Sequence, residues 1–157
     1  MQIAILGFGK MGRQITQKIM NGGHQTVVWN RTKEVLETYK LQHPDYVMKQ
    51  IFKTSHSIDA LGDLLSKPRL ILSMLPAGDA TESVMQDIFT LSLQGDIVID
   101  AGNANFKDTE RRFEQFKNKG VRYLGIGVSG GVHGLENGFS LMVGGDQEAY
   151  HHVLPIL

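Results

Sequence analysis

The stretch IAILGFGKMG, residues 3–12, decides how this chain folds. A short apolar run ends in the pattern G-x-G-x-x-G, and helical spacing of apolar residues follows at once. Gly7 allows a tight turn off the strand, Gly9 lets an anionic group approach the backbone, and Gly12 lets the next helix pack closely on the strand. The start of that helix points free N–H groups and the positive end of its dipole at the anion. The stretch therefore predicts a pyrophosphate-binding loop.

The surroundings of this pattern matter, because glycine is frequent in a chain with 18 glycines. The pattern follows a predicted strand and opens a predicted helix, and a second predicted strand, residues 26–29, ends at Trp29. That order is typical of a βαβ unit that binds a dinucleotide. An ordinary glycine-rich turn is the alternative interpretation, and these neighbouring features make it the weaker one.

Composition bounds the class of protein. A length of 157 residues is enough for one domain with its own core. The hydrophobic fraction of 41% is typical of a globular chain, and the formal net charge of +0 argues against bulk attraction to nucleic acid or a membrane surface. The chain has 0 cysteines, no leader pattern and no run long enough to span a bilayer. We therefore expect a cytoplasmic protein without disulfides or thiolate metal sites.

Strand and helix patterns alternate along the chain. Strands are predicted at residues 3–6, 26–29, 50–54, 69–75, 96–100, 121–126 and 139–143. Helices are predicted after Gly12 and at residues 33–41, 58–65, 80–93 and 108–119, with a short one after Asp146. This alternation predicts an α/β fold, a Rossmann-type, doubly wound, mostly parallel sheet with helices on both faces. We expect residues 1–157 to form one NAD(P)-binding domain.

Polar and glycine-rich loops follow the predicted strands. They span residues 7–12, 30–32, 75–78, 101–105 and 129–131. Because ligands bind outside the carboxyl ends of the strands in such a sheet, we expect these loops to share one crevice. The expected cofactor contacts are Gly7, Phe8, Gly9, Lys10, Met11, Gly12, Asn30, Arg31, Thr32, Ser73, Met74, Leu75 and Asn103. Simple turns, which are also rich in Gly and Asn, are the alternative.

The residues after the second predicted strand indicate which nucleotide binds. An NAD-preferring site usually ends this strand with Asp or Glu, which binds the ribose 2′-OH. Here the strand is followed by Asn30, Arg31 and Thr32. Asn30 and Thr32 can donate hydrogen bonds to a 2′-phosphate, and Arg31 can pair with it and stack on adenine. The sequence predicts NADP, unless Arg31 is only a solvated surface charge.

Three further stretches are more specific. They read DAGNANFKDTERR at residues 100–112, VSGG at residues 128–131 and FSLMVGG at residues 139–145. Together with the first loop and NRT at residues 30–32, they resemble the N-terminal domain of the decarboxylating 6-phosphogluconate dehydrogenase family. The resemblance covers nearly the whole chain, but only the first part of a typical family polypeptide.

The resemblance implies a reaction and residue roles. The family oxidises C3 of 6-phosphogluconate by hydride transfer to NADP, and loss of carbon dioxide then leads to ribulose 5-phosphate without a metal. By this likeness Asn103 lies between nicotinamide and substrate, and Ser129, Gly130 and Gly131 bind the sugar acid. An asparagine offers both a donor and an acceptor, and a serine beside exposed backbone N–H groups can hold a carboxylate. Turn residues are the alternative for both. Arg111 and Arg112 are expected to be helix-surface or fold-stabilising charges.

Two features depart from the family pattern. An acidic residue commonly follows the S-G-G stretch, where this chain has Val132, His133 and Gly134, and we expect His133 to be a loop histidine. The family's catalytic lysine and its partner asparagine lie in an all-helical domain beyond the position of Leu157. We expect a truncated chain that binds NADP with little turnover alone. A homodimer or homotetramer is expected only with that helical domain.

Two other interpretations are open. A β-hydroxyacid dehydrogenase of the 3-hydroxyisobutyrate type shares the first loop, a segment like MLPAG at residues 74–78, and S-G-G. Its fifth strand usually ends in S-T and lacks D-T-x-R-R, so Gly102-Asn103 and residues 108–112 favour the phosphogluconate assignment. A non-catalytic NADP-sensing domain is the second alternative, although it would leave Asn103 and residues 129–131 without an evident purpose.

Overall fold

The computed structural model describes the backbone of residues 1–157 and every side chain except those of Ala80 and Val132. The strands are β1 (Gln2–Leu6), β2 (Gln25–Trp29), β3 (Phe52–Thr54), β4 (Leu70–Ser73), β5 (Ile97–Asp100), β6 (Arg122–Ser129) and β7 (Ser140–Gly145). The helices are α1 (Lys10–Asn21), α2 (Glu34–Gln42), α3 (Pro44–Met48), α4 (Leu61–Leu64), α5 (Asp79–Leu91), α6 (Phe106–Asn118), the 3-10 turn η1 (Gly131–His133), α7 (Gly134–Asn137) and α8 (Gln147–Val153).

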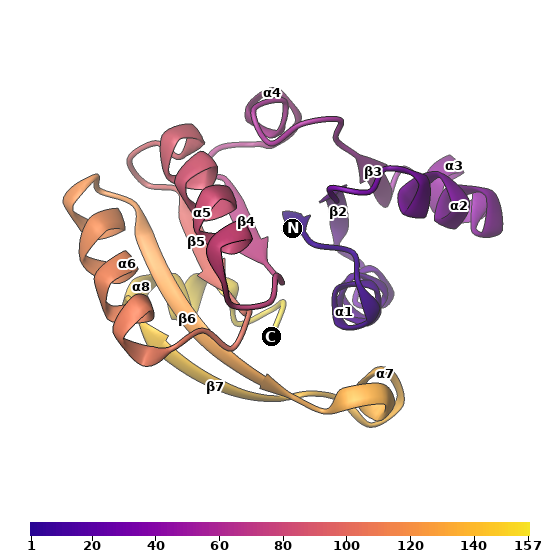
Figure 1. Ribbon diagram of the computed structural model, residues 1–157. Helices are drawn as coiled ribbons and strands as arrows, with labels where there is room; N and C mark the ends of the chain where they lie inside the picture. The colour runs from indigo at the N-terminus through magenta and orange to yellow at the C-terminus, as the bar shows by residue number, and fades with distance from the viewer.

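The strands form one sheet in the order β3-β2-β1-β4-β5-β6-β7. Every neighbouring pair from β3 to β6 is parallel, and β7 is antiparallel to β6 along one side of the sheet (Figure 1). The prediction of a Rossmann-type, doubly wound, mostly parallel sheet is therefore confirmed. Because the parallel strands share one direction, their carboxyl ends meet at a single edge, which we call the carboxyl edge.

Alternate residues of each strand enter different cores, as the pleat of a strand requires. In β1, Ile3 and Ile5 belong to a core that includes residues of α1, α2 and α8. Ala4 and Leu6 belong to a second core, shared with residues of α4, α5 and α6. Strands buried on both faces need near-continuous apolar sequence, which is why β1, β4 and β5 could be found from the sequence.

Several elements differ from the sequence-based predictions. The region before β3 contains α3, which begins at Pro44, because proline without its N–H fits the first turn of a helix. The helix predicted at residues 58–65 is only the single turn α4. Strand β6 continues to Ser129, three residues beyond its predicted end at Ile126, because β7 pairs with it up to Ser129 and Ser140. Among the described residues, no helix is both long and apolar enough to cross a membrane.

Candidate dinucleotide site

The glycine loop after β1 has the geometry that its sequence predicts. Gly7 adopts a φ of +100°, which L side chains rarely adopt. A Cβ on Gly12 would lie 2.0 Å from the Gly7 carbonyl oxygen, so the helix could not pack this closely with any other residue. A Cβ on Gly9 would meet nothing within 4 Å. The predicted roles of Gly7 and Gly12 are confirmed, and Gly9 borders open space into which a ligand fits.

Helix α1 begins directly at this loop. Its N-cap is Gly9, which provides no side chain to accept from the first N–H groups. Lys10 is exposed, and Met11 is half-buried against the core. The start of α1 therefore combines N–H groups that receive no side-chain cap from Gly9, the positive end of a 12-residue helix and an exposed lysine. An anionic diphosphate fits this arrangement.

Phe8 lies inside the protein, although its backbone belongs to the loop. Its ring is 2% exposed and contacts Tyr39 edge-on, with 4.9 Å between ring centroids. Its backbone N–H donates to Oδ1 of Asn30 at 2.9 Å. The side chain of Phe8 therefore anchors the loop in the core, and any contact with a nucleotide would come from its backbone.

The segment after β2 places its charge in solvent. The Asn30 carboxamide bridges two loops, because its Nδ2 donates to the Thr32 carbonyl at 2.8 Å while Oδ1 accepts from Phe8. Arg31 and Thr32 are exposed. Arg31 also lines a cavity of about 320 Å³, together with Lys33 and other residues. Asn30 thus braces the glycine loop, and Arg31 is free to meet a ligand from solvent.

The loop after β4 packs backbone to backbone between its neighbours. A Cβ on Gly7 would lie 2.5 Å from the Met74 carbonyl oxygen, and a Cβ on Gly102 would lie 2.2 Å from the Leu75 carbonyl oxygen. Met74 and Leu75 are half-buried at this edge. Ser73, predicted as a cofactor contact, is buried within β4, and its hydroxyl has no hydrogen-bond partner among the described residues. A contact between Ser73 and the cofactor stays a prediction.

Asn103 joins the loop after β5 to the end of β6. Its backbone has a φ of +53°, in the left-handed region. Its carboxamide accepts from the Val128 N–H at 3.0 Å and donates to the Val128 carbonyl at 3.3 Å. The side chain therefore ties the loop after β5 to the backbone of Val128 near the end of β6. Asn103 is nevertheless exposed, so it can also meet a ligand.

The predicted substrate residues follow Val128 directly. Ser129 is the last residue of β6 and is exposed, as are Gly130 and Gly131. These two glycines have φ values of +151° and +52°, so the chain turns here in a way that favours glycine. The structure places Asn103 and Ser129 beside each other through their shared neighbour Val128. His133 is exposed in η1, as expected for a loop histidine.

These contacts connect all of the loops that the sequence singled out. The loop after β1 contacts those after β2 and β4, through Phe8 and Gly7. The loop after β4 contacts that after β5 through Gly102, and Asn103 links the latter to β6. The carboxyl edge is thus one continuous surface from the glycine loop to Ser129.

A mostly buried ion-pair network lies on the inner side of the carboxyl edge. Arg112 of α6 pairs with Asp100, the last residue of β5, and with Glu82 of α5. Tyr123 of β6 donates its hydroxyl hydrogen to Oδ2 of Asp100 at 3.0 Å. The Arg112 and Asp100 side chains are only 3% and 2% exposed. We call Glu82, Asp100, Arg112 and Tyr123 the Arg112 network.

The charges of this network shift its titrating groups. Burial raises the pKa of Tyr123, and the neighbouring Asp100 carboxylate raises it further. Burial alone would lower the pKa of Arg112, but the hydrogen bond to Glu82 and the charge of Asp100 outweigh it and raise that pKa. The pKa of Glu82 is lowered, because its bonds to Arg111 and Arg112 outweigh its partial burial. All three shifts favour a charged Arg112 and a charged Glu82 beside a neutral Tyr123.

Sequence reasoning found Arg112 but not its partners. The expectation that it is a fold-stabilising charge is confirmed, since Arg112 is buried and paired. Arg111, beside it, is the helix-surface charge, with 46% of its side chain exposed. Asp100 received no role in the sequence-based prediction. The one available signal was an acidic residue ending an otherwise apolar buried strand, which requires a cation nearby.

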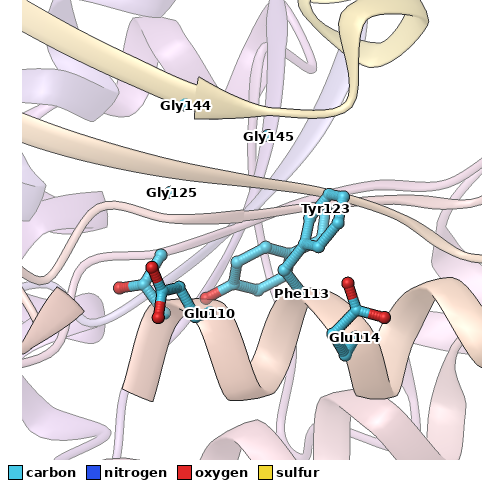
Figure 2. Close-up of a pocket in the computed structure, with 8 residues that line it drawn as sticks. Glu110, Phe113, Glu114, Tyr123, Gly125, Gly144 and Gly145 are labelled. Atoms are coloured by element: carbon cyan, nitrogen blue, oxygen red, sulfur yellow. The ribbon is translucent and has the colours of Figure 1, made fainter. Parts of the chain in front are cut away.

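A separate hollow of about 570 Å³ lies between α6 and the β6–β7 ribbon. Figure 2 shows Phe113 and Tyr123 at its centre, with the carboxylates of Glu110 and Glu114 along α6. Gly125, Gly144 and Gly145 line the opposite side. Its lining residues include none of the predicted cofactor or substrate residues, so the hollow is distinct from the carboxyl edge.

The doubly wound sheet and the glycine loop at its carboxyl edge define a dinucleotide-binding domain of the Rossmann type. Residues 2–157 match the family described as the NAD binding domain of 6-phosphogluconate dehydrogenase. The chain belongs to this family, and the resemblance seen in the sequence is confirmed.

Known relatives agree with this assignment. The chain is 37% identical over 155 residues to the NAD(+)-dependent, decarboxylating 6-phosphogluconate dehydrogenase of Bacillus subtilis, covering 99% of this chain and 32% of that protein. A Plasmodium falciparum 6-phosphogluconate dehydrogenase, described with its cofactor NADP+ and its substrate, superposes with a TM-score of 0.89 at 33% identity, over 100% of this chain and 33% of that one. The chain therefore spans about a third of the length of these relatives.

A more distant structure shares the fold alone. The 3-hydroxyisobutyrate dehydrogenase of Mycobacterium tuberculosis superposes with a TM-score of 0.76 at 21% identity, over 99% of this chain and 50% of that one.

Proposed function

We propose that this chain is the NADP-binding part of a decarboxylating 6-phosphogluconate dehydrogenase. The observation that carries the proposal is the chain of contacts along the carboxyl edge. These contacts join the glycine loop to Asn30 and to the loop after β4, join that loop to Gly102, and join Asn103 to Val128, the neighbour of Ser129. A dinucleotide is long enough to require all of these loops, whereas a mononucleotide would use only the first two. Because the chain spans about a third of its relatives' length, we assign to it the cofactor part of the site and not the complete reaction.

The residues at the glycine loop would bind the diphosphate and the adenosine. The open space at Gly9 and the uncapped start of α1 fit a diphosphate. Exposed Arg31 fits a 2′-phosphate, which its guanidinium can bind through two hydrogen bonds. Strand β2 ends at Trp29 without a carboxylate, and the cavity that Arg31 lines is bordered by Lys33 as well as by Asp59 and Asp87. These features support NADP over NAD, although one relative is NAD(+)-dependent.

The part of the carboxyl edge from Asn103 to Gly131 would bind the nicotinamide and the sugar acid. The bound dinucleotide supplies the hydride acceptor for oxidation of C3 of 6-phosphogluconate. Asn103, held against Val128, would orient the two reactants through its remaining donor and acceptor capacity. Ser129 and the backbone N–H groups of Gly130 and Gly131 are exposed and would bind the polar groups of the sugar acid.

The amino-acid composition supports a proposal for the cellular location of the protein and for the kinds of molecule that it binds. The 0 cysteines and the formal net charge of +0 support a cytoplasmic protein whose ligands are small molecules, not nucleic acid or membrane. We propose further that dimer or tetramer formation by this family depends on its helical domain and not on residues 1–157.

Calorimetric titration of the purified chain tests the assignment. We expect NADP to bind more tightly than NAD, and 6-phosphogluconate to bind measurably only once NADP is present. Binding of 3-hydroxyisobutyrate in place of 6-phosphogluconate would instead support the β-hydroxyacid type. Binding of NADP without any sugar acid would favour a cofactor-sensing role, and failure to bind either dinucleotide would refute the proposal.

A further inference from the structure

The Asp100 carboxylate connects the Arg112 network to the loop that carries Asn103. Its Oδ2 atom contacts Arg112 and accepts from Tyr123, while Oδ1 accepts from the Gly102 N–H at 3.2 Å. Gly102 immediately precedes Asn103 in the chain. The orientation of this one carboxylate therefore determines where the backbone N–H of Gly102 points, and with it the turn that leads into Asn103.

The conformation of Asn103 is stabilised by contacts around it. Its φ of +53° lies in the left-handed region, which asparagine tolerates better than most residues with a Cβ, and neighbouring contacts decide whether it is kept. Two contacts are available, the hydrogen bonds to Val128 on one side and the Gly102 turn on the other. Gly102 is also confined, because the Leu75 carbonyl oxygen leaves no room for a Cβ.

We propose that Arg112 is a positioning residue for Asn103. Arg112 neutralises the buried Asp100 carboxylate and fixes its rotation, so that Oδ1 holds the Gly102 N–H and Asn103 stays against Val128. Without this cation the carboxylate would be an unpaired buried charge, which is driven toward water or toward protonation. The proposal rests on the assignment of Asn103 to the nicotinamide side of the site, and it extends that function to a residue that touches no ligand.

The substitution Arg112→Lys tests this role with little change in charge. Lysine keeps the positive charge but lacks the planar guanidinium that contacts Asp100 and Glu82 at once. Arg111→Lys is the matched control, because Arg111 is adjacent on α6 and pairs with Glu82 and Asp108 but not with Asp100. Asn103→Ala gives the full effect of losing the side chain that Arg112 is proposed to hold.

Hydrogen exchange at the Val128 amide measures the position of Asn103 without any ligand. This N–H donates to Oδ1 of Asn103, so it exchanges faster when Asn103 leaves β6. In Arg112→Lys we expect exchange at Val128 to rise about tenfold more than exchange at Ile5 in the centre of the sheet. A general loss of stability would raise exchange at both amides alike. Arg111→Lys should leave the ratio unchanged.

Ligand titrations supply a second measurement. Adenosine 2′,5′-bisphosphate carries the adenosine half of NADP and lacks the nicotinamide that Asn103 is proposed to contact. In Arg112→Lys we expect about tenfold weaker binding of NADP and unchanged binding of adenosine 2′,5′-bisphosphate. Adding Arg112→Lys to Asn103→Ala should cause no further loss, since both changes remove the same interaction.

The outcomes separate two kinds of failure. Equal Val128 exchange in Arg112→Lys and Arg111→Lys would overturn the positioning role, as would additive losses of NADP affinity in the double variant. A wild-type chain that binds neither NADP nor adenosine 2′,5′-bisphosphate would overturn the proposed function. In that case the exchange measurement would still decide whether Arg112 holds Asn103 in place.

Discussion

The two ends of the carboxyl edge hold their ligand-facing groups by different means. At the glycine loop, backbone atoms pack against backbone atoms, and the critical contact joins Gly7 and Gly12 within one short stretch. At Asn103, the Arg112 network holds the loop through the buried side chains of Asp100, Arg112 and Tyr123, together with the partly exposed Glu82 of α5. The comparison shows that the conformation of the glycine loop is specified by residues close together in the sequence. Side chains larger than glycine should therefore destabilise it. The conformation at Asn103 is specified by contacts between residues far apart in the sequence, and substitutions that change the charges of the Arg112 network should destabilise it.

The largest expected effect separates the two adjacent arginines of α6. Arg112→Met leaves Asp100 buried without its cation, and we expect a loss of about 3–5 kcal/mol in the free energy of unfolding. Arg111→Met removes an ion pair that is 46% exposed on the arginine side and should cost at most about 1 kcal/mol. Urea denaturation of both variants measures the difference. Similar losses would mean that burial of the network contributes little.

The next effect separates two glycines of the loop. The methyl group of Gly12→Ala would lie 2.0 Å from the Gly7 carbonyl oxygen, and we expect a loss of about 3 kcal/mol in stability. Gly9→Ala meets open space at a φ of −71°, so its stability should stay within about 0.5 kcal/mol of wild type. Its methyl group would occupy the proposed diphosphate space and weaken NADP binding. Thermal denaturation and titration together check both variants, and normal NADP affinity in Gly9→Ala would contradict the proposed site.

Arg31→Ala tests the outer part of the glycine-loop end. Loss of the bond to a 2′-phosphate should weaken NADP by about 2 kcal/mol, roughly 30-fold, while NAD, which can lose only the stacking of Arg31 on adenine, should weaken much less. Lys117→Ala is the control, because Lys117 is an exposed cation in the last turn of α6. Titration with both dinucleotides measures the effect. An equal loss for NADP and NAD would show that Arg31 does not read the 2′-phosphate.

Removing the hydroxyl group from each of two buried tyrosines should change the free energy of unfolding by different, smaller amounts. Tyr123→Phe removes a hydrogen bond to a buried carboxylate, and we expect a loss of about 1.5 kcal/mol. The Tyr39 hydroxyl is buried without a hydrogen-bond partner among the described residues, so Tyr39→Phe should be neutral or slightly stabilising. Denaturation midpoints measure both changes. Destabilisation by Tyr39→Phe would show that this hydroxyl is satisfied in solution.

The raised pKa of Tyr39 should make the stability of the fold depend on pH in the alkaline range. Burial, followed by the charge of Tyr46, raises the pKa of Tyr39 from 10.0 to about 12. Between these values the unfolded chain loses the Tyr39 proton while the folded chain keeps it, so stability falls as pH rises, by up to about 1.4 kcal/mol per pH unit. Tyr39→Phe should show a shallower fall between pH 10 and 12. Identical slopes for wild type and variant would contradict this assignment.

Sequence reasoning succeeded where the physical cause was local. The doubly wound sheet and the place of its site were predicted from the apolar runs of β1, β4 and β5 and from the glycine loop. Buried strands require consecutive apolar residues and close helix packing requires glycine, so both can be recognised in a short stretch of sequence. Sequence reasoning was less accurate for β6, which continues past its predicted end at Ile126 to Ser129. The added residues pair with β7, and that pairing depends on a strand further along the chain.

By itself, then, the sequence determined the fold class, the glycine loop and the family, since all three follow from residue types at close spacing. Only the tertiary structure decided that Asn30 braces the glycine loop, that Asn103 bonds to Val128 of β6, and that Asp100 pairs with Arg112 next to this loop. The physical reason is that a hydrogen bond or a buried ion pair joins residues far apart in the chain, and its energy depends on distance and burial, which residue order does not encode.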